Sequence, residues 1–293
     1  MLIPQRLRDM IDDGVIQEVI RPLKSGKEAS VFVVMADNHY CAAKVYKDAE
    51  RRTFRNRQDY VEGRQVGDSR KQRAIANGSR FGKKQSEAAW QSVEATVLTQ
   101  LHAAGVRVPR VLSGGEGVLV MELICDASGN PAQQIVHIPF TAQEAIRAHH
   151  LLIHQIARML CAGFVHGDLS EFNILMAGDG PMIIDVPQAV DAASNNNAKR
   201  LLLRDVDNVT RYFAKFAPAV RRGEYGQEMW HLYQNTTLRP ETVLTGHFKN
   251  ATKIVDANVI LREVQAAKEE AAKREEIRRI RQEQAKLKNQ PRR

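Results

Sequence analysis

The sequence predicts an α+β fold of two lobes, in which a sheet-rich first half is followed by a helical second half. Apolar residues alternate with a period of two over residues 18–46, as in strands, and recur every three to four positions after residue 141, as in helices. The chain has 293 residues, of which 43% are hydrophobic and 26% charged, and is therefore long enough to bury a core in each of two packed lobes.

The first half is expected to contain five strands and one helix. The segments EVIRPL and ASVFVVMA alternate like strands, and a turn at DNHY leads to a third strand, CAAKVYK. A helix is predicted from about Ser86 to a stop at Gly105, because apolar residues recur on one face. The segments RVPRVLSGG and GVLVMELI predict two further strands. Residues 51–84 lack periodicity and are expected to form a long flexible loop.

The second half is expected to be helical. Thr141 and Glu144 form a T-x-x-E capping box, which predicts a helix that runs to Gly163. Two short strands should bracket the turn GDGP, and LLLRDVDNVTRYFAKF predicts another helix. Charged residues spaced for i,i+4 pairs predict a long exposed helix after Asn258. We therefore expect an N-terminal lobe over residues 1–121, a C-terminal lobe over 122–256, and a basic helix or tail over 257–293.

The net charge of +9 is concentrated in two segments. Residues 51–84 contain 11 Lys and Arg against 3 Asp and Glu, and residues 257–293 contain 11 against 6. Two cationic segments on a near-neutral body can bind phosphate-rich partners, and we expect contact with RNA or the ribosome as one use of them. Solvated surface charge explains the tail equally well.

Composition also excludes several classes of protein. No apolar run approaches the roughly 18 residues that a membrane span needs, and the N-terminus lacks the apolar core of a secretory signal. The three cysteines, Cys41, Cys125 and Cys161, are scattered and suggest neither disulfides nor a zinc site. These features predict a cytoplasmic location.

Three polar residues around one predicted hairpin suggest a metal-dependent site. HGDLSEFNIL contains Asp168 and Asn173, and MIIDV contains Asp185. Oxygen donors of this kind suit Mg²⁺ that shares its coordination with substrate phosphates. Phosphoryl transfer also needs a carboxylate that orients the attacking hydroxyl. Asp168 suits that second role, and Asn173 and Asp185 suit the first.

The upstream half supplies complementary residues. Lys44 lies on an apolar strand and requires an anionic partner, because an unpaired buried ammonium is very costly. Glu94 on the predicted helix is the expected partner, with Glu87 as a less favoured alternative. The turn SGKEASVF offers Ser25, Ser30 and backbone N–H groups that could cover phosphates. Lys44 with Glu94, then Asp168, Asn173 and Asp185, is the order of residues in a protein-kinase-like site.

Several motifs in register resemble the RIO family of atypical serine/threonine protein kinases over about residues 15–215. These motifs are SGKEASVF, AAKVYK, VPRVL, VMELI, HGDLSEFNIL, IIDVPQAV and RDVDN. The resemblance implies a bilobal protein-kinase-like fold. About two dozen residues precede SGKEAS, so the sequence is more similar to compact bacterial-type members and to the branch without an N-terminal winged helix.

The resemblance also implies a role for each residue of the site. Lys44 would hold the nucleotide phosphates, steadied by Glu94. Asp168 would be the catalytic acid/base residue, and Asn173 and Asp185 would hold Mg²⁺ or Mn²⁺. In some relatives the aspartate that matches Asp185 is itself phosphorylated. The remaining ATP-binding residues would be Ser25, Gly26, Lys27 and Ser30 at the phosphates, Met121 behind the adenine, and the main chains of Glu122 and Ile124 beside it.

Two departures from ordinary protein kinases shape the expected activity. The turn reads His-Gly-Asp rather than His-Arg-Asp, and only 18 residues separate Asp185 from Arg204, with no Ala-Pro-Glu after them. A long activation loop and a shelf for peptide substrates are therefore not expected. We expect ATP-dependent phosphorylation of Ser or Thr, including autophosphorylation, or ATP hydrolysis in a ribosome-related assembly.

Two other functions are compatible with parts of the sequence. Small-molecule phosphotransferases of the aminoglycoside or choline kinase type also contain His-Gly-Asp and a strand that ends in Ile-Asp, but SGKEAS, DVPQAV and RDVDN favour the RIO family. An RNA- or ribosome-binding module with a nucleotide pocket would use the basic segments without catalysis. His149, His150 and His154 share a predicted helix, but without a third ligand they are expected to be packing or surface residues rather than a zinc site.

Overall fold

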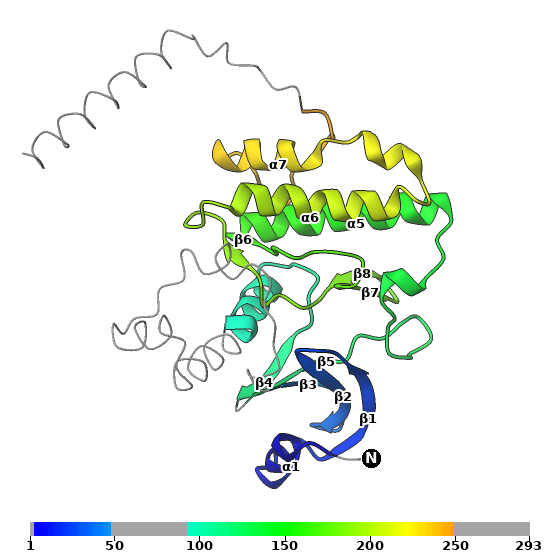
Figure 1. Ribbon diagram of the computed structural model, residues 1–293, viewed down its shortest axis with the longest axis vertical. Helices are drawn as coiled ribbons and strands as arrows, with labels where there is room; N and C mark the ends of the chain where they lie inside the picture. Colours follow the sequence, from blue (N-terminus) through cyan, green and yellow to red (C-terminus); the bar gives the residue numbers. More distant parts are fainter. Residues whose placement is uncertain (1–2, 48–92, 116, 249–293) are drawn as a thin grey trace, which may run out of the picture. The chain divides into compact units, whose positions relative to one another are not determined.

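A five-stranded antiparallel sheet forms the N-terminal part of the computed structural model, which describes residues 3–47, 93–115 and 117–248 (Figure 1). All five strands were predicted, although residues 107–110 of the segment RVPRVLSGG precede the fourth strand instead of belonging to it. The strand order is β1-β2-β3-β5-β4. The strands are β1 Glu18–Ser25, β2 Ala29–Ala36, β3 His39–Tyr46, β4 Val111–Gly115 and β5 Val118–Glu122.

The turn between β2 and β3 is shorter than the predicted DNHY. Ala36 pairs with His39, so only Asp37 and Asn38 connect the strands. Their φ angles of 49° and 60° are the left-handed values that a two-residue hairpin turn requires, and Asp and Asn tolerate them better than most residues. His39 and Tyr40 consequently belong to β3.

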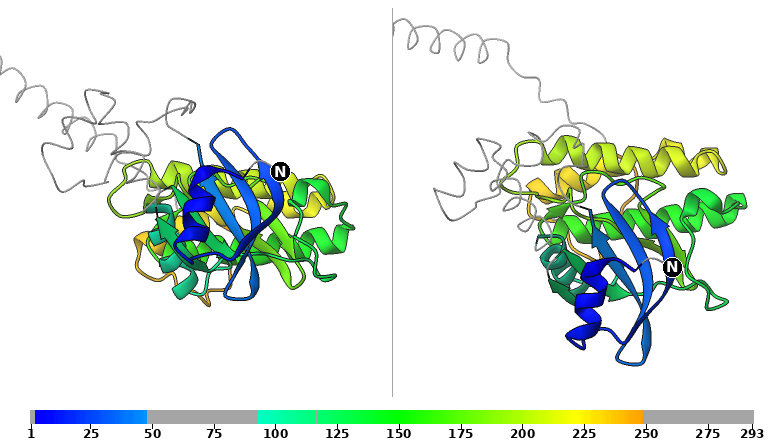
Figure 2. Two further views of the ribbon diagram at one scale, coloured as in Figure 1. Left: turned by 90° about the horizontal axis from the view of Figure 1, so that it is seen from below. Right: turned by 60° about the horizontal axis from the view of Figure 1, so that its bottom comes forward.

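Both faces of the sheet are covered. The helix α1 (Gln5–Asp12), which was not predicted, packs on one face, where Leu7 joins a cluster with Val34 and Val120 (Figure 2). On the other face, residues 93–103 are helical, as predicted for this part of the 86–105 segment, and bury Leu98 and Leu101 against the same core as Leu119. A sheet covered on both faces explains why β2 and β3 are apolar at nearly every position.

Three helices pack side by side in the C-terminal part (Figure 1). They are α5 (Ala142–Cys161), α6 (Ala198–Phe213) and α7 (Tyr225–Gln234), accompanied by the short 3₁₀ helices η2 (Ile135–His137) and η3 (Pro218–Arg222). The capping box that begins α5 is confirmed, since Thr141 N–H donates to Glu144 and Glu144 N–H donates to the Thr141 hydroxyl. The helix α7 was missed, because its few buried residues give too weak a period. Trp230 of α7 is buried in the core.

Two short strand pairs lie between the sheet and the helices (Figure 1). β7 (Ile174–Ala177) and β8 (Gly180–Ile183) form the predicted hairpin, and β6 (Phe164–Val165) pairs with β9 (Val190–Asp191). β6 directly precedes the segment HGDLSEFN, and β9 follows the segment that contains Asp185. The two pairs therefore fix both ends of the two segments in which the predicted polar residues lie.

Some predictions fall on residues that the structure does not describe. These are the loop 51–84, the tail 257–293 and Glu87. The division of the chain at residues 121 and 256 also stays a prediction. Among the residues that are described, no helix is long and apolar enough to cross a membrane.

Candidate active site

A cavity of about 740 Å³ brings together residues from the sheet, from the segment after β5 and from the β7–β8 hairpin. Its volume is in the range of pockets that bind small molecules and cofactors. Nine of the residues predicted for the site line it: Gly26, Lys27, Lys44, Glu94, Met121, Glu122, Ile124, Asn173 and Asp185. Ser25, Ser30 and Asp168 do not line it.

Lys44 pairs with two carboxylates at this cavity. Its Nζ lies 2.7 Å from Glu94 Oε1 and 2.6 Å from Asp185 Oδ1. The Lys44 side chain is 12% exposed and that of Glu94 only 2%, so water screens this pair weakly. Burial lowers the pKa of the Lys44 ammonium, but the charges of Glu94 and Asp185 raise it by more, and Lys44 is therefore a cation. Among the described residues, the predicted partner Glu94 is thus one of the two carboxylates that pair with Lys44, and Asp185 is the other.

Tyr46 is a residue of this cluster that the sequence analysis missed. Its hydroxyl donates to Glu94 Oε2, and its ring centroid lies 5.3 Å from Lys44 Nζ. Burial, with the negative charge of Glu94, raises the pKa of the Tyr46 phenol, so that it remains a donor. The two-residue period of a strand could have indicated this role, because Tyr46 follows Lys44 by two positions on β3 and so lies on the same face of the strand.

Asp185 lies two residues beyond β8, with φ of 65° in the left-handed region. Aspartate adopts this conformation more readily than most other residues. Burial raises the pKa of the Asp185 carboxyl, but the charge and hydrogen bond of Lys44 lower it by more, so that the net shift is downward. The group is consequently an anion that faces the cavity.

The segment that contains Asp168 is held by α6. Asp205 accepts the N–H groups of Gly167 at 2.7 Å and Leu169 at 3.0 Å through its two carboxylate oxygens. Arg204 donates to the carbonyl of Gly167, and Asn208 donates to that of Leu169. These α6 residues are three of the four polar positions of the motif RDVDN, for which no roles were predicted. Asn208 follows Asp205 by three residues and Arg204 by four, spacings at which side chains are neighbours on a helix surface.

Asp168 lies at the tip of this segment and is exposed. Although the residue is exposed, the protein around its carboxyl removes part of the hydration, and this, with the charge of Asp185, raises the pKa of Asp168; Arg204 lowers it, and the net shift is upward. A carboxylate with a raised pKa is a better proton acceptor than an ordinary one. Asp168 is not part of the cavity lining, but its backbone carbonyl accepts a hydrogen bond from Asn173, which is.

Asn173 connects the Asp168 and Asp185 segments. Its side-chain Nδ2 donates to the backbone carbonyl of Asp168 at 2.8 Å, which leaves the side-chain amide oxygen as the atom suited to a cation. Its backbone carbonyl accepts Ile184 N–H at 2.9 Å. No cluster of three or more His, Cys, Asp or Glu side chains suited to a metal ion exists among the described residues. One carboxylate and one amide oxygen fit Mg²⁺, which usually takes its remaining ligands from substrate phosphates and water.

The predicted phosphate turn is only partly at the cavity. Ser25 and Ser30 lie opposite each other on β1 and β2, with their hydroxyl oxygens 3.1 Å apart. Lys47 Nζ donates to the carbonyl of Gly26 at 2.6 Å, which braces the turn from the end of β3. Gly26 and Lys27, between the two serines, do line the cavity.

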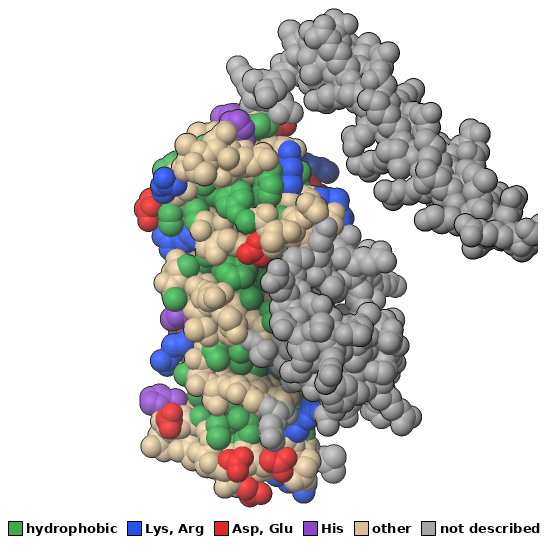
Figure 3. Space-filling model, turned by 90° about the vertical axis from the view of Figure 1, so that its left-hand side faces the viewer, with side chains coloured by type: hydrophobic (Ala, Val, Ile, Leu, Met, Phe, Trp, Pro, Cys, Tyr) green, Lys and Arg blue, Asp and Glu red, His purple; other side chains and the backbone are tan. Residues whose placement is uncertain are grey.

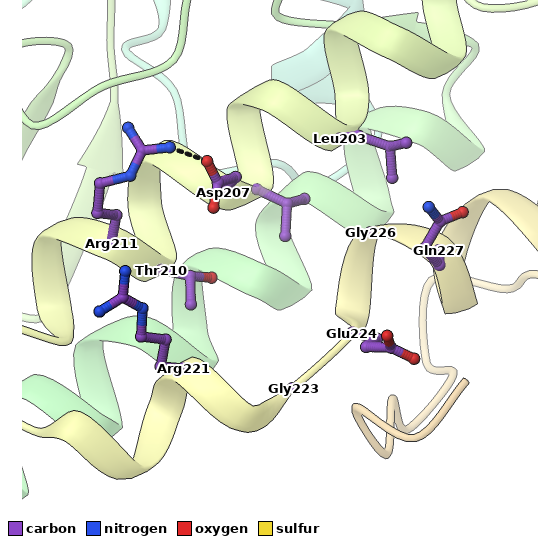
Figure 4. Close-up of a pocket in the computed structure, with 10 residues that line it drawn as sticks. Leu203, Asp207, Thr210, Arg211, Arg221, Gly223, Glu224, Gly226 and Gln227 are labelled. Carbon is purple, nitrogen blue, oxygen red and sulfur yellow. Dashed lines mark hydrogen bonds and ion pairs between the residues drawn. The ribbon is translucent and has the colours of Figure 1, made fainter. Parts of the chain in front are cut away.

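A second and smaller cavity of about 170 Å³ lies between α6, η3 and α7 (Figure 4). No predicted site residue lines it. Arg211 is paired with Asp207, and Arg221 and Glu224 add one charge of each sign, so the lining carries no net charge. Of the three helix histidines, His149 is fully buried and its Nε2 lies 3.0 Å from the Thr210 hydroxyl, which fits the predicted packing role.

Comparison with known proteins agrees with this geometry. The model of the RIO domain matches residues 30–225. The chain is 34% identical over 210 residues to the RIO-type serine/threonine-protein kinase Rio1 of Haloferax volcanii, an alignment that covers 70% of this chain and 67% of that one. It is 30% identical over 213 residues to the human serine/threonine-protein kinase RIO1, covering 72% of this chain but only 36% of the human one.

The structural comparison supports the same fold. The crystal structure of a Rio2 kinase–ADP/Mg²⁺–phosphoaspartate complex from Chaetomium thermophilum is similar with a TM-score of 0.56 and 21% identity, covering 89% of this chain and 75% of that one. The bilobal kinase-like α+β fold predicted from the sequence is thereby confirmed. This chain belongs to the RIO family of serine/threonine protein kinases.

Proposed function

We propose that this chain binds ATP in the 740 Å³ cavity and transfers its γ-phosphate to a Ser or Thr hydroxyl, its own included, or to water. Asp168 accepts the proton of the attacking hydroxyl as the new O–P bond forms and the bond between the γ-phosphorus and the β,γ-bridging oxygen breaks, which releases ADP. Lys44 binds the nucleotide phosphates. Met121, Glu122 and Ile124 bind the adenine.

The observation that carries this proposal is the position of Lys44 between Glu94 and Asp185. An ammonium held by two carboxylates at 2.7 and 2.6 Å is preorganised, so its charge needs little rearrangement to meet a phosphate. Only its pairing with Asp185 has to change, because Glu94 is independently held by Tyr46.

Asn173 and Asp185 would hold a divalent cation, with Mg²⁺ the expected ion and Mn²⁺ a substitute. When bound, that ion neutralises charge on the β- and γ-phosphates. The chain itself keeps the two ligands together through the hydrogen bond from Ile184 N–H to the carbonyl of Asn173.

Two variants test the assignment. Asp168→Asn should keep MgATP binding and lose transfer of radiolabelled phosphate by at least about a hundredfold, because the proton acceptor is lost. Asp185→Asn should lose transfer and also the metal-dependent part of ATP affinity. Asp191→Asn is a matched control, since Asp191 accepts the N–H groups of Ala193 and Ser194 in a turn and does not line the cavity. Wild-type transfer rates in the Asp168 variant would contradict the role given to Asp168.

The molecule that accepts the phosphate distinguishes the proposed protein kinase from a small-molecule phosphotransferase. Only 18 residues lie between Asp185 and Arg204, so little chain is available to support an extended peptide, and autophosphorylation or hydrolysis is favoured. Turnover that depends on an aminoglycoside or on choline would reject protein phosphorylation as the function.

RNA or a ribosomal particle is the partner that we propose for the basic segments 51–84 and 257–293. The face of the described body in Figure 3 shows basic, acidic and hydrophobic side chains intermixed, and the excess of positive charge lies in those two segments. Binding to RNA should therefore weaken steeply with added salt, because counterions are released on binding. An affinity that is independent of salt would remove this partner. A cytoplasmic location is part of the same proposal.

A further inference from the structure

Lys24 of β1 is a cation of the cavity that has no role in the proposal above. It is exposed, lines the cavity next to Leu23, and its Nζ donates to Gln134 Oε1 at 2.6 Å. The two residues are 110 positions apart. This hydrogen bond connects the first strand of the sheet with the segment that leads into η2, across the lining of the cavity.

Gln134 is itself fixed to the segment that contains the predicted metal ligand. Its Nε2 donates to the carbonyl of Phe172, the residue before Asn173, and its backbone forms a β-bridge with Leu175. The neighbouring Gln133 accepts Met176 N–H at 2.9 Å. The amide oxygen that receives Lys24 is therefore held in place by the C-terminal part of the chain and has little freedom to follow the lysine.

Lys24 lines the same cavity as Gly26 and Lys27 of the turn that is expected to cover the phosphates. The partner of Lys24 is a neutral amide, so its positive charge is not cancelled by that contact. An ammonium has three donors, and Lys24 can accordingly bind an anion while it keeps its bond to Gln134.

A lysine with only a structural role would be expected to have a different partner. A lysine that only joined the two parts of the protein would be better served by a carboxylate at position 134, since an ion pair with hydrogen bonding is stronger than a bond to an amide. A solvated lysine, in turn, would make no directed contact across the cavity. The combination of a fixed neutral acceptor, an uncancelled charge and a place in the cavity lining favours a ligand with negative charge.

We propose that Lys24 contacts the phosphates of bound ATP and ADP, that Gln134 positions its ammonium over the cavity, and that this contact slows nucleotide release. The inference rests on the proposed function, because it requires a nucleotide in this cavity. It adds a second phosphate-binding lysine, on β1, to Lys44 on β3.

The test measures nucleotide release from the full chain. Stopped flow follows the dissociation of fluorescent ADP and ATP in the presence of Mg²⁺ from the wild type, Lys24→Met and Lys24→Arg. The affinity of each protein for adenosine is measured by competition. Lys24→Met should raise both dissociation rates about tenfold, the effect of one lost charge-assisted bond, and leave adenosine affinity unchanged. Lys24→Arg should stay close to the wild type, because it keeps the charge.

Arg21→Met is the matched control. Arg21 is an exposed cation on the same strand, but it does not line the cavity, and its loss should leave the dissociation rates unchanged. Equal rates for Lys24→Met and Arg21→Met would overturn the inference. So would an equal loss of adenosine and ADP affinity, since adenosine has no phosphate. A wild type that binds no nucleotide would instead reject the proposed function, and this inference with it.

The positioning role of Gln134 has a separate readout. Gln134→Leu should speed ADP release in the wild-type background and have no further effect in the Lys24→Met background, because Gln134 acts through the lysine. An equal effect in both backgrounds would show that Gln134 supports the cavity independently of Lys24 and would overturn its assignment.

Discussion

Lys44 and Asp185 are 141 residues apart in the sequence, and the Lys44 ammonium lies 2.6 Å from the Asp185 carboxylate. β3 supplies the first residue and the segment after β8 the second, so this one contact joins the sheet to the part of the chain that precedes α6. The cation that is expected to hold phosphate and the anion that is expected to hold metal are thus paired with each other in this structure.

The buried Lys44–Glu94 pair should contribute a large interaction energy to the stability of the fold. Lys44→Met leaves Glu94, which is 2% exposed, without its cation and should reduce the free energy of unfolding by on the order of 3 kcal/mol. The double variant Lys44→Met/Glu94→Gln should lose less than the sum of the two single variants, because the uncompensated charge is removed. Urea unfolding of all four proteins measures this. Additive losses would show that the pair contributes no interaction energy.

Asp205 should affect turnover more than nucleotide affinity. Both of its oxygens accept N–H groups of the Asp168 segment, whereas the amide that Asp205→Asn introduces would offer only one oxygen acceptor. We expect kcat to fall by about tenfold or more, since small displacements of a catalytic group are costly, with KM for ATP nearly unchanged. Asp207→Asn, an exposed position two residues further along α6, is the control. A change confined to KM would contradict this role.

Arg204 should set the acidic limb of the pH–rate profile. Asp168 must be ionised to accept a proton, so activity falls as the pH drops through its pKa. Arg204 lowers that pKa against the effect of burial, and Arg204→Met should therefore move the acidic limb of kcat to higher pH. Arg204→Lys, which keeps the charge, should return it towards the wild-type position. If Arg204→Met lowers kcat equally at every pH, Arg204 acts through its bond to Gly167 alone.

His149 should make the fold sensitive to acid. Burial lowers the pKa of His149 to about 4, with a smaller contribution from His150. The folded state thus favours neutral His149. The stability that depends on it is present above the unfolded pKa of about 6.5 and is lost as the pH falls through the folded value, a loss of about 3 kcal/mol by pH 4.

The variant His149→Gln separates this effect from general acid denaturation. Glutamine can still bond Thr210 but does not titrate, so the decline in melting temperature between pH 7 and pH 4 should become shallower. Buried His166, whose pKa is also lowered, should account for part of the remaining slope. His102→Gln, at an exposed position that does not contribute to the pKa shift of His149, is the control. An unchanged decline in His149→Gln would show that His149 is not the titrating group.

Local patterns along the chain were enough to predict the strands of the sheet, the capped helix α5 and the order of the polar residues from Lys44 to Asp185. Period-two alternation indicates a strand, a T-x-x-E box indicates a helix start, and an isolated lysine on an apolar strand requires an anion. The expected pairing with Glu94 followed from that last requirement, because burial leaves a lysine few alternatives.

Which groups meet across the molecule depended on the packing of separate elements. The hydroxyl of Tyr46 on Glu94, the two bonds from the Asp168 segment to Asp205, and the bond from Lys24 to Gln134 all join residues far apart in the sequence. Periodicity indicates that a residue is buried but not what it is buried against, since that follows only from the tertiary arrangement. The same reason explains why α1, which covers one face of the sheet, was not expected from its own short sequence.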